Sequence, residues 1–405
     1  MVIEGIADLP LHEGHVPDYL LRRMKMLGSL IAKYIVELYG PEELLRRFSN
    51  PLWFQAFNNV IGMDWDSSGS TTITLYVLKT VFQPEKFHEY NVAVIGGKGR
   101  DARNLQQEVV RLNKDIDTDK LIETSRLAAK IDSTGLQDGY TLYIHCLALT
   151  DSGKMLIIQQ GMNLDLKIAR RYHILVDGAQ ILSCEKDPHS GVASKAITSA
   201  LNLVDEGSQN ARRAILEIVE STPPDSLVQD LYHVNRILKN LPDIRVFSSN
   251  NLFESNQVEL SKKIQNCPIY YKPVTNVKKV AQAAETIKRE SPGNFKELLL
   301  IKGIGPETIR AIALIADLIY GYEPSLKDPT TYLFDPFLYA YAHGGKDGVP
   351  YRIKVHEIDK TIEFFTRLID EVKTGNKEKE VMLRNLAKFV SRFKGKLDSS
   401  SSYFF

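Results

Sequence analysis

The sequence predicts an α+β protein, in which a domain of helices and a small antiparallel sheet precedes a mostly helical domain. Two observations favour this class. Apolar residues recur at helical spacing near the start of the chain and again over most of the part after residue 277. The strand-like segments instead gather between residues 90 and 182, where short turns favour hairpins. This is not the regular strand–helix alternation of a doubly wound sheet.

The first helices follow from spacing and from helix breakers. Residues 18–39 carry apolar side chains at helical intervals and stop before Gly40-Pro41. A second helix is expected after this break, and a third over residues 51–61. The run DSSGSTT, residues 66–72, supplies side-chain oxygens that can cap a helix ending near residue 82.

The sheet is expected in the middle of the chain. YNVAVI, residues 90–95, reads as a buried strand, and a polar helical region follows over residues 104–130. The turn DSGK joins residues 141–149 to residues 155–159 in a predicted hairpin. HILVDGAQIL, from His173, suggests a further pair of short strands, whereas the later DPHSG reads as a turn.

Breaks in composition suggest four segments. Residues 1–220 are predicted to form the α+β domain and residues 221–276 a loop-rich connector. Residues 277–398 are predicted to form the helical domain, and residues 399–405 a frayed tail.

Composition limits the function classes. The net charge is +1, so any binding of phosphates must rely on local groups. The three cysteines form no CxxC pair, which argues against a disulfide framework or a thiolate zinc site. We find no signal peptide and no apolar run of membrane-spanning length, so we expect a cytoplasmic protein with no membrane partner.

The most specific local pattern is FKELLLIKGIGPETIRAIALIADLIYG, residues 295–321. It predicts a helix-hairpin-helix element that contacts DNA phosphates without reading the base sequence. Gly303 and Gly305 would let the backbone approach a phosphate, and the start of the second helix would attract the anion. Lys302 and Arg310 would add positive charge. The alternative is a plain helical hairpin with a glycine cap.

Polar residues between positions 132 and 173 suggest a chemical site. Asp132, Asp138 and His145 are the predicted ligands of Mg²⁺ or Mn²⁺, and the site would hydrolyse a phosphodiester bond. Gln159 or Gln160 would add a ligand or position a water molecule. The alternative is that these residues only cap turns and satisfy buried backbone groups.

Other residues are candidate phosphate contacts. Lys98 lies in GGKGRD, which resembles a phosphate nest but lacks the spacing of a nucleotide-binding P-loop. Arg170, Arg171 and His173 would clamp the scissile phosphate or protonate a leaving oxygen. HEGH, residues 12–15, suggests either a metal pair or an ordinary polar loop.

Several stretches resemble the domain of unknown function 763 family, found in archaea and some bacteria. They are GIADLPLHEGHVP, NPLWFQAFNNVIGMDWDSSGSTT, GGKG, AAKIDSTGLQDGYTLYIH, IIQQGMN, ARRYHI, DPHSG and AYAHGGKDGVPY, and they span residues 3 to about 355. The resemblance implies one long unit with a helix-hairpin-helix near its end and a role concerned with DNA. It implies no particular chemistry.

The hairpin is also similar to that of helix-hairpin-helix DNA glycosylases, which implies a catalytic Asp328 or Asp335 further along. Glu307 stands next to Thr308 where lyase-type glycosylases carry a lysine, which argues against a Schiff-base mechanism. The leading hypothesis is a metal-dependent deoxyribonuclease in DNA repair or processing. The alternatives are a DNA glycosylase and a non-catalytic factor that binds or protects DNA ends.

Overall fold

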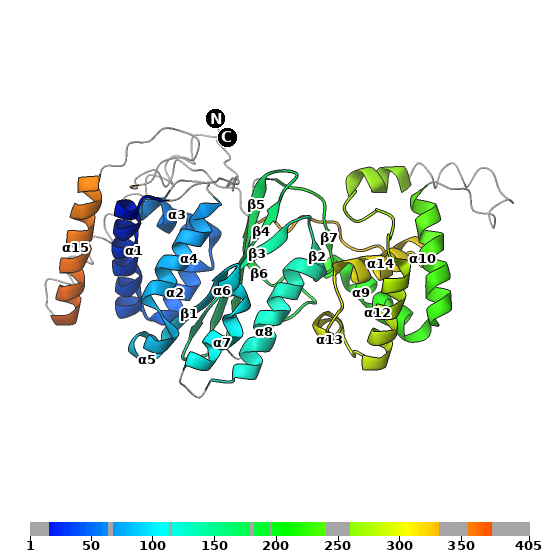
Figure 1. The fold of residues 1–405 in the computed structure, drawn as a ribbon, viewed down its shortest axis with the longest axis horizontal. Helices are drawn as coiled ribbons and strands as arrows, with labels where there is room; N and C mark the ends of the chain where they lie inside the picture. Colours follow the sequence, from blue (N-terminus) through cyan, green and yellow to red (C-terminus); the bar gives the residue numbers. More distant parts are fainter. Residues whose placement is uncertain are drawn as a thin grey trace, which may run out of the picture.

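An antiparallel sheet of five strands lies at the centre of the computed structural model (Figure 1), which describes residues 16–63, 68–112, 116–178, 182–194, 196–239, 260–331, 343 and 355–374. The strands, in the spatial order β1-β3-β4-β5-β6, are β1 (Val92–Lys98), β3 (Thr141–Thr150), β4 (Met155–Asn163), β5 (Ile168–Val176) and β6 (His189–Ala193). A separate ribbon pairs β2 (Leu136–Gln137) with β7 (Leu201–Asn202). The predicted α+β class and the predicted β3–β4 hairpin are confirmed.

Both faces of the sheet are buried, because successive side chains on a strand point to opposite faces. On β4, Leu156 and Ile158 pack into one core, whereas Met155 and Ile157 pack into the other. This explains why the strand reads as a continuous apolar run rather than an alternating one.

Four helices from the start of the chain and one from its end cover the first face. They are α1 (Asp18–Tyr39), α2 (Pro41–Phe48), α3 (Pro51–Val60), α4 (Gly69–Val81) and α15 (Val355–Thr374). The bounds of α1 and α3 agree with the prediction to within one residue. Asn50 caps α3 by accepting hydrogen bonds from the amides of Leu52 and Trp53, as expected of an asparagine before a helix.

The second face is covered by short helical segments and by α8. These elements are η1 (Pro84–Lys86), α5 (Phe87–Tyr90), α6 (Arg100–Arg103), α7 (Leu105–Val109), η2 (Val110–Leu112) and α8 (Thr118–Lys130). The helix α8 runs directly into a π-helical turn, η3 (Ile131–Gly135), which carries Asp132. Such turns widen a helix and are frequent at functional sites.

The core of the second face continues into a group of helices beside the sheet. This group includes the 3-10 turn η4 (Glu206–Ser208) and the helices α9 (Gln209–Ser221), α10 (Pro224–Leu238), α12 (Val277–Glu290), α13 (Phe295–Leu300) and α14 (Pro306–Leu318). In Figure 1 these helices lie at the end of the molecule opposite α15 and α1.

The helical group differs from the predicted domain division in two ways. The predicted α+β domain would include α9, which packs with the helical group instead. The predicted connector contains α10. The prolines at 223 and 224 do not prevent this helix, because Pro224 occupies the first helical position, where a missing amide hydrogen costs nothing. Finally, α15 packs against α1 and not with the other C-terminal helices, and Arg23 pairs with Asp359 across that contact.

Within the described ranges, no helix is both long enough and apolar enough to cross a membrane. Three predicted features lie outside the described residues: the HEGH motif, Asp335 and the tail over residues 399–405.

Candidate nucleic-acid interface

The turn between α13 and α14 contains two glycines, and no neighbouring atom fills the place that a side chain would take at either of them. Gly303 has a φ of +90°, a conformation that favours glycine over other residues. Gly305 precedes α14 with φ −129° and ψ −179°, which any residue adopts. A Cβ atom added at either glycine would meet no other atom within 4 Å. Neither the backbone nor internal packing therefore requires a glycine at position 305.

The start of α14 is open to solvent. No side chain caps it, Pro306 occupies its first turn, and Lys302, Gly303 and Pro306 are exposed. The amides at the start of a helix, together with the positive end of its dipole, attract anions. An anion at this turn would therefore meet the positive end of the α14 dipole.

Two cations of α8 lie against this turn and were not predicted from the sequence. Lys130 donates a hydrogen bond to the carbonyl oxygen of Ile304, and the exposed Arg126 donates one of 3.4 Å to that of Leu300. Burial and the nearby Arg126 both lower the pKa of Lys130. The helical spacing of four residues between Arg126 and Lys130 was the only sequence signal that they share a face.

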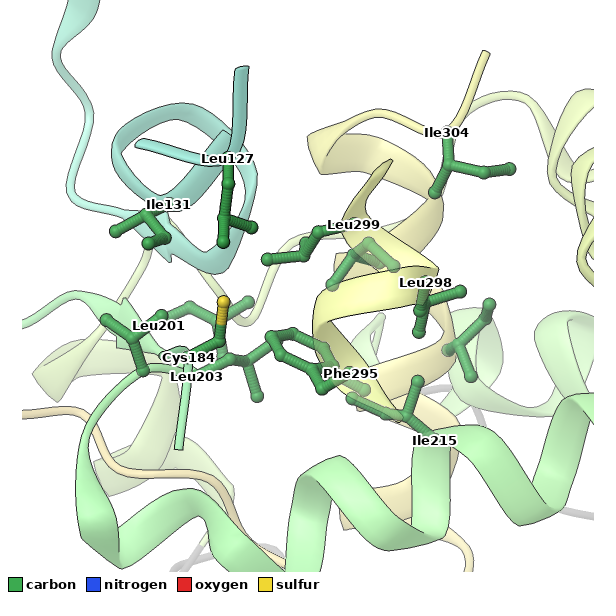
Figure 2. Close-up of a cluster of buried hydrophobic side chains, with 14 of the residues drawn as sticks. Leu127, Ile131, Cys184, Leu201, Leu203, Ile215, Phe295, Leu298, Leu299 and Ile304 are labelled. Atoms are coloured by element: carbon green, nitrogen blue, oxygen red, sulfur yellow. The ribbon is translucent and has the colours of Figure 1, made fainter. Parts of the chain in front are cut away.

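Apolar packing fixes the turn to α8. Figure 2 shows Leu127, near the end of α8, next to Leu299 of α13, and Ile131, the first residue of η3, in the same cluster. Ile304, in the turn itself, is also buried in this core. Because protein interiors are closely packed, the turn and the cations of α8 are held in a fixed relation.

Arg310 does not fit its predicted role as a phosphate contact. Its side chain is buried and donates hydrogen bonds to the carbonyl oxygens of Tyr270 and Lys272. It also pairs with Glu307 at 2.7 Å. The structure therefore corrects this prediction, because the guanidinium group is already engaged inside the helical group.

A chain of hydrogen bonds brings three of the predicted site residues together on the second face of the sheet. The imidazole of His145 contacts the Ser125 hydroxyl through Nε2 at 2.7 Å and the Gln159 amide oxygen through Nδ1 at 2.9 Å. Gln159 donates in turn to Asp132 at 2.5 Å. These residues come from α8, η3, β3 and β4, so only the fold brings them together.

Asp132 continues the chain to two residues that were interpreted as part of a turn. Its second oxygen lies 2.7 Å from Nε2 of His189, whose Nδ1 lies 2.6 Å from Asp187. Burial alone would lower the pKa of His189, but the carboxylates of Asp132 and Asp187 raise it to about 10. Burial raises the pKa of Asp132, and the imidazolium opposes that rise. His145 is half-buried and hydrogen-bonds Ser125 and Gln159 rather than a carboxylate, and burial lowers its pKa.

Asp138 is not part of this hydrogen-bond chain, because Arg170 binds its carboxylate instead. Arg170 donates to Asp138 at 2.8 Å and to Asp328 at 2.7 Å, and Tyr172 donates to Asp138 at 2.7 Å. The side chain of Arg170 is fully buried. Arg170 is therefore a structural cation between two carboxylates, which corrects the prediction that it clamps a substrate phosphate.

Gln160, Arg171 and His173 lie on the opposite face from Gln159 and Arg170, as strand alternation requires. Arg171 is buried and donates to His173 and to Thr71, which also donates to Gln160. His173 bonds the carbonyl oxygen of Phe48, and burial holds its pKa well below the usual value. A neutral buried imidazole and a buried guanidinium do not fit the predicted contact with a substrate phosphate.

A family model described as "Protein of unknown function (DUF763)" matches residues 5–353. The chain belongs to this family. No curated protein and no solved structure matches it. The DUF763 match covers both the α13–α14 turn and the buried hydrogen-bond chain, and it ends before α15 begins at Val355.

The predicted metal ligands are not assembled in this DUF763 protein. Asp132 faces His189, Asp138 faces Arg170, and His145 faces Ser125 and Gln159. Among the residues with described positions, no group of three or more His, Cys, Asp or Glu side chains could hold a metal ion.

Lys98 keeps an exposed side chain, unlike the predicted clamps on β5. It lines an open pocket of about 260 Å³ between α4 and the end of β1, together with Tyr76 and Lys79. The GGKG segment is not a free nest, because β1 runs through Lys98 and the amide of Gly99 donates to the carbonyl oxygen of Tyr143.

The buried hydrogen-bond chain through His189 is expected to make the stability of the protein depend on pH. His189 has a folded pKa of about 10, above its usual value near 6.5, so its charge stabilises the folded DUF763 protein fully below about pH 6.5. That stabilisation is lost as pH rises towards 10. Urea unfolding should show a free energy that falls between pH 7 and 9, with a slope approaching about 1.4 kcal/mol per pH unit. His189→Gln should flatten this slope, and an unchanged slope would contradict the charge assignment.

Proposed function

We propose that this protein binds the sugar–phosphate backbone of DNA through the α13–α14 turn, without reading the base sequence. The observation that carries the proposal is Gly305, a glycine that neither its backbone angles nor its neighbours require. A phosphate that contacts the main chain is a physical reason for the missing side chain.

Local charge supports the same proposal. The exposed Lys302 lies in the turn, and Arg126 and Lys130 lie beside it on α8. Arg126 and Lys130 repel each other because both are positively charged, and a bound phosphate would offset that repulsion. Glu307, the acidic residue of the first turn of α14, is paired with Arg310. The chain has a net charge of only +1, so this cluster must supply the attraction.

The proposal covers binding and not hydrolysis. The carboxylates of Asp132 and Asp138 are each engaged by a cationic side chain, and Asp328 bonds Arg170 and the amide of Thr198. The metal-dependent nuclease and the glycosylase stay predictions. Incubating the protein and its Asp138→Ala variant with labelled DNA, in Mn²⁺ and in EDTA, tests hydrolysis separately.

The test of binding is fluorescence anisotropy with a labelled DNA duplex of arbitrary sequence at several salt concentrations. Affinity should fall as salt rises, and two duplexes of unrelated sequence should bind equally. Lys302→Gln and Arg126→Gln should each lower the slope of log K against log salt by about 1.

A matched control for these variants is Lys86→Gln. Lys86 is exposed and lies in η1, directly before α5, and Figure 1 shows α5 well away from α13. This control should leave the slope unchanged. Equal slopes for all three variants would show that charge acts nonspecifically over the whole surface, and no binding at low salt would remove the proposal.

A further inference from the structure

Exposed aliphatic side chains gather at one end of the sheet. Three of the four exposed Leu, Ile and Val side chains in the described ranges are Leu164, Leu166 and Ile197, with exposed fractions of 72%, 50% and 61%. Leu164 and Leu166 lie in the turn between β4 and β5. The residue before Ile197, Ala196, accepts a hydrogen bond from Arg170 near the start of β5, which places Ile197 at the same end.

The β4–β5 turn presents its two leucines on a rigid support. The side chain of Asn163 accepts hydrogen bonds from the amides of Asp165 and Leu166, at 3.1 and 3.0 Å. Lys167 has a φ of 55°, and the strands pair up to Asn163 and Ile168 on either side. Turns of this kind usually carry small polar residues, so two leucines held in the solvent need another explanation.

This turn lies near the proposed phosphate contact. Gln137 donates a hydrogen bond of 2.9 Å to the carbonyl oxygen of Pro306, at the start of α14. Two residues later, a Cβ added at Gly139 would lie 3.2 Å from the side-chain nitrogen of Asn163. The path from Pro306 through Gln137, Gly139 and Asn163 to Leu164 is short, and its summed length places the start of α14 within about 25 Å of Leu164. One turn of a DNA duplex spans about 34 Å.

We propose that Leu164 and Leu166 form a wedge that enters between base pairs of a DNA duplex whose backbone is held at the α13–α14 turn. This inference rests on the proposed function and names its preferred substrate. Aliphatic side chains that enter between bases unstack one step and bend the duplex. The favoured ligand is therefore deformable DNA, with a mismatch or a flexible TA step at the contact.

The test uses a duplex that carries 2-aminopurine at a central TA step, because the fluorescence of this base rises when it unstacks. Full-length wild-type protein should raise the fluorescence at saturation. Leu164→Ala/Leu166→Ala should reduce that rise by about threefold or more, because only the wedge is shortened. Val110→Ala, at an exposed valine elsewhere, is the matched control and should keep the full rise.

Anisotropy on the same samples separates the two proposals. If wild-type protein does not bind the duplex, both the proposed function and the wedge fail. If it binds but the fluorescence does not rise, or rises equally with the double variant, the wedge alone fails. If the double variant instead alters the molecular mass in light scattering and keeps the full rise, the leucines form a protein contact and the wedge is overturned.

Discussion

Replacing Gly305 by leucine is expected to weaken DNA binding at least tenfold, which corresponds to about 1.4 kcal/mol, while the fold stays intact. The backbone at Gly305 is extended and an added Cβ atom meets open space, so we expect the folded chain to accommodate leucine. Removing a glycine also restricts the unfolded chain, so the free energy of unfolding should stay equal or rise slightly. Anisotropy titration and urea unfolding measure the two quantities on the same preparation.

Gly293→Leu provides a matched control for this variant. Gly293 is exposed, has an ordinary backbone conformation, and lies just before α13 at the other end of the same hairpin. Its replacement should leave DNA affinity unchanged. Equal affinity of the Gly305→Leu variant and the wild type would place the phosphate contact elsewhere and remove the main support for the proposed function.

Arg170→Met is expected to have the largest effect on stability, a loss of about 3–5 kcal/mol in the free energy of unfolding. Its guanidinium is fully buried between Asp138 and Asp328. Methionine fills a similar volume but leaves both carboxylates buried without their cation. Urea unfolding followed by circular dichroism measures the loss.

A control variant and a rescue variant show whether that loss comes from the two unpaired carboxylates. Arg213→Met, at an exposed arginine on α9, should change the free energy of unfolding by less than about 0.5 kcal/mol. Combining Arg170→Met with Asp138→Asn and Asp328→Asn should recover at least half of the loss, because neutral partners no longer need the cation. A loss below about 1 kcal/mol for Arg170→Met alone would mean that other groups compensate the two carboxylates.

Features set by local sequence could be predicted. The bounds of α1 agree with its apolar spacing and its Gly40-Pro41 end. The α13–α14 turn was located from its glycines and Pro306, because a helix end and a helix start are coded within a few neighbouring residues.

The candidate site was harder to predict because its contacts join distant segments. Ser125 and His189 meet His145 and Asp132 only after the sheet and α8 have packed. No spacing in the sequence records such a contact. His189 in particular lies in DPHSG, which reads as an ordinary turn.

A better interpretation of β5 was available from strand geometry. Arg170 and Arg171 are adjacent, so on a strand they must point to opposite faces. The strand Ile168–Val176 begins and ends with apolar residues, which indicates burial on both faces. Together these two rules argue against one phosphate clamp formed by both arginines. They predict two separate buried cations, each of which needs its own hydrogen-bond partners.

The contact between α1 and α15 has a consequence for the order of assembly during synthesis. Tyr34 on α1 meets the ring of Phe365 on α15 edge-on, with ring centroids 6.1 Å apart. The ribosome releases α15 after all the other described helices. Part of the surface of α1, the earliest of the described helices, therefore stays uncovered until translation has passed residue 374, and the layer that it belongs to is completed last.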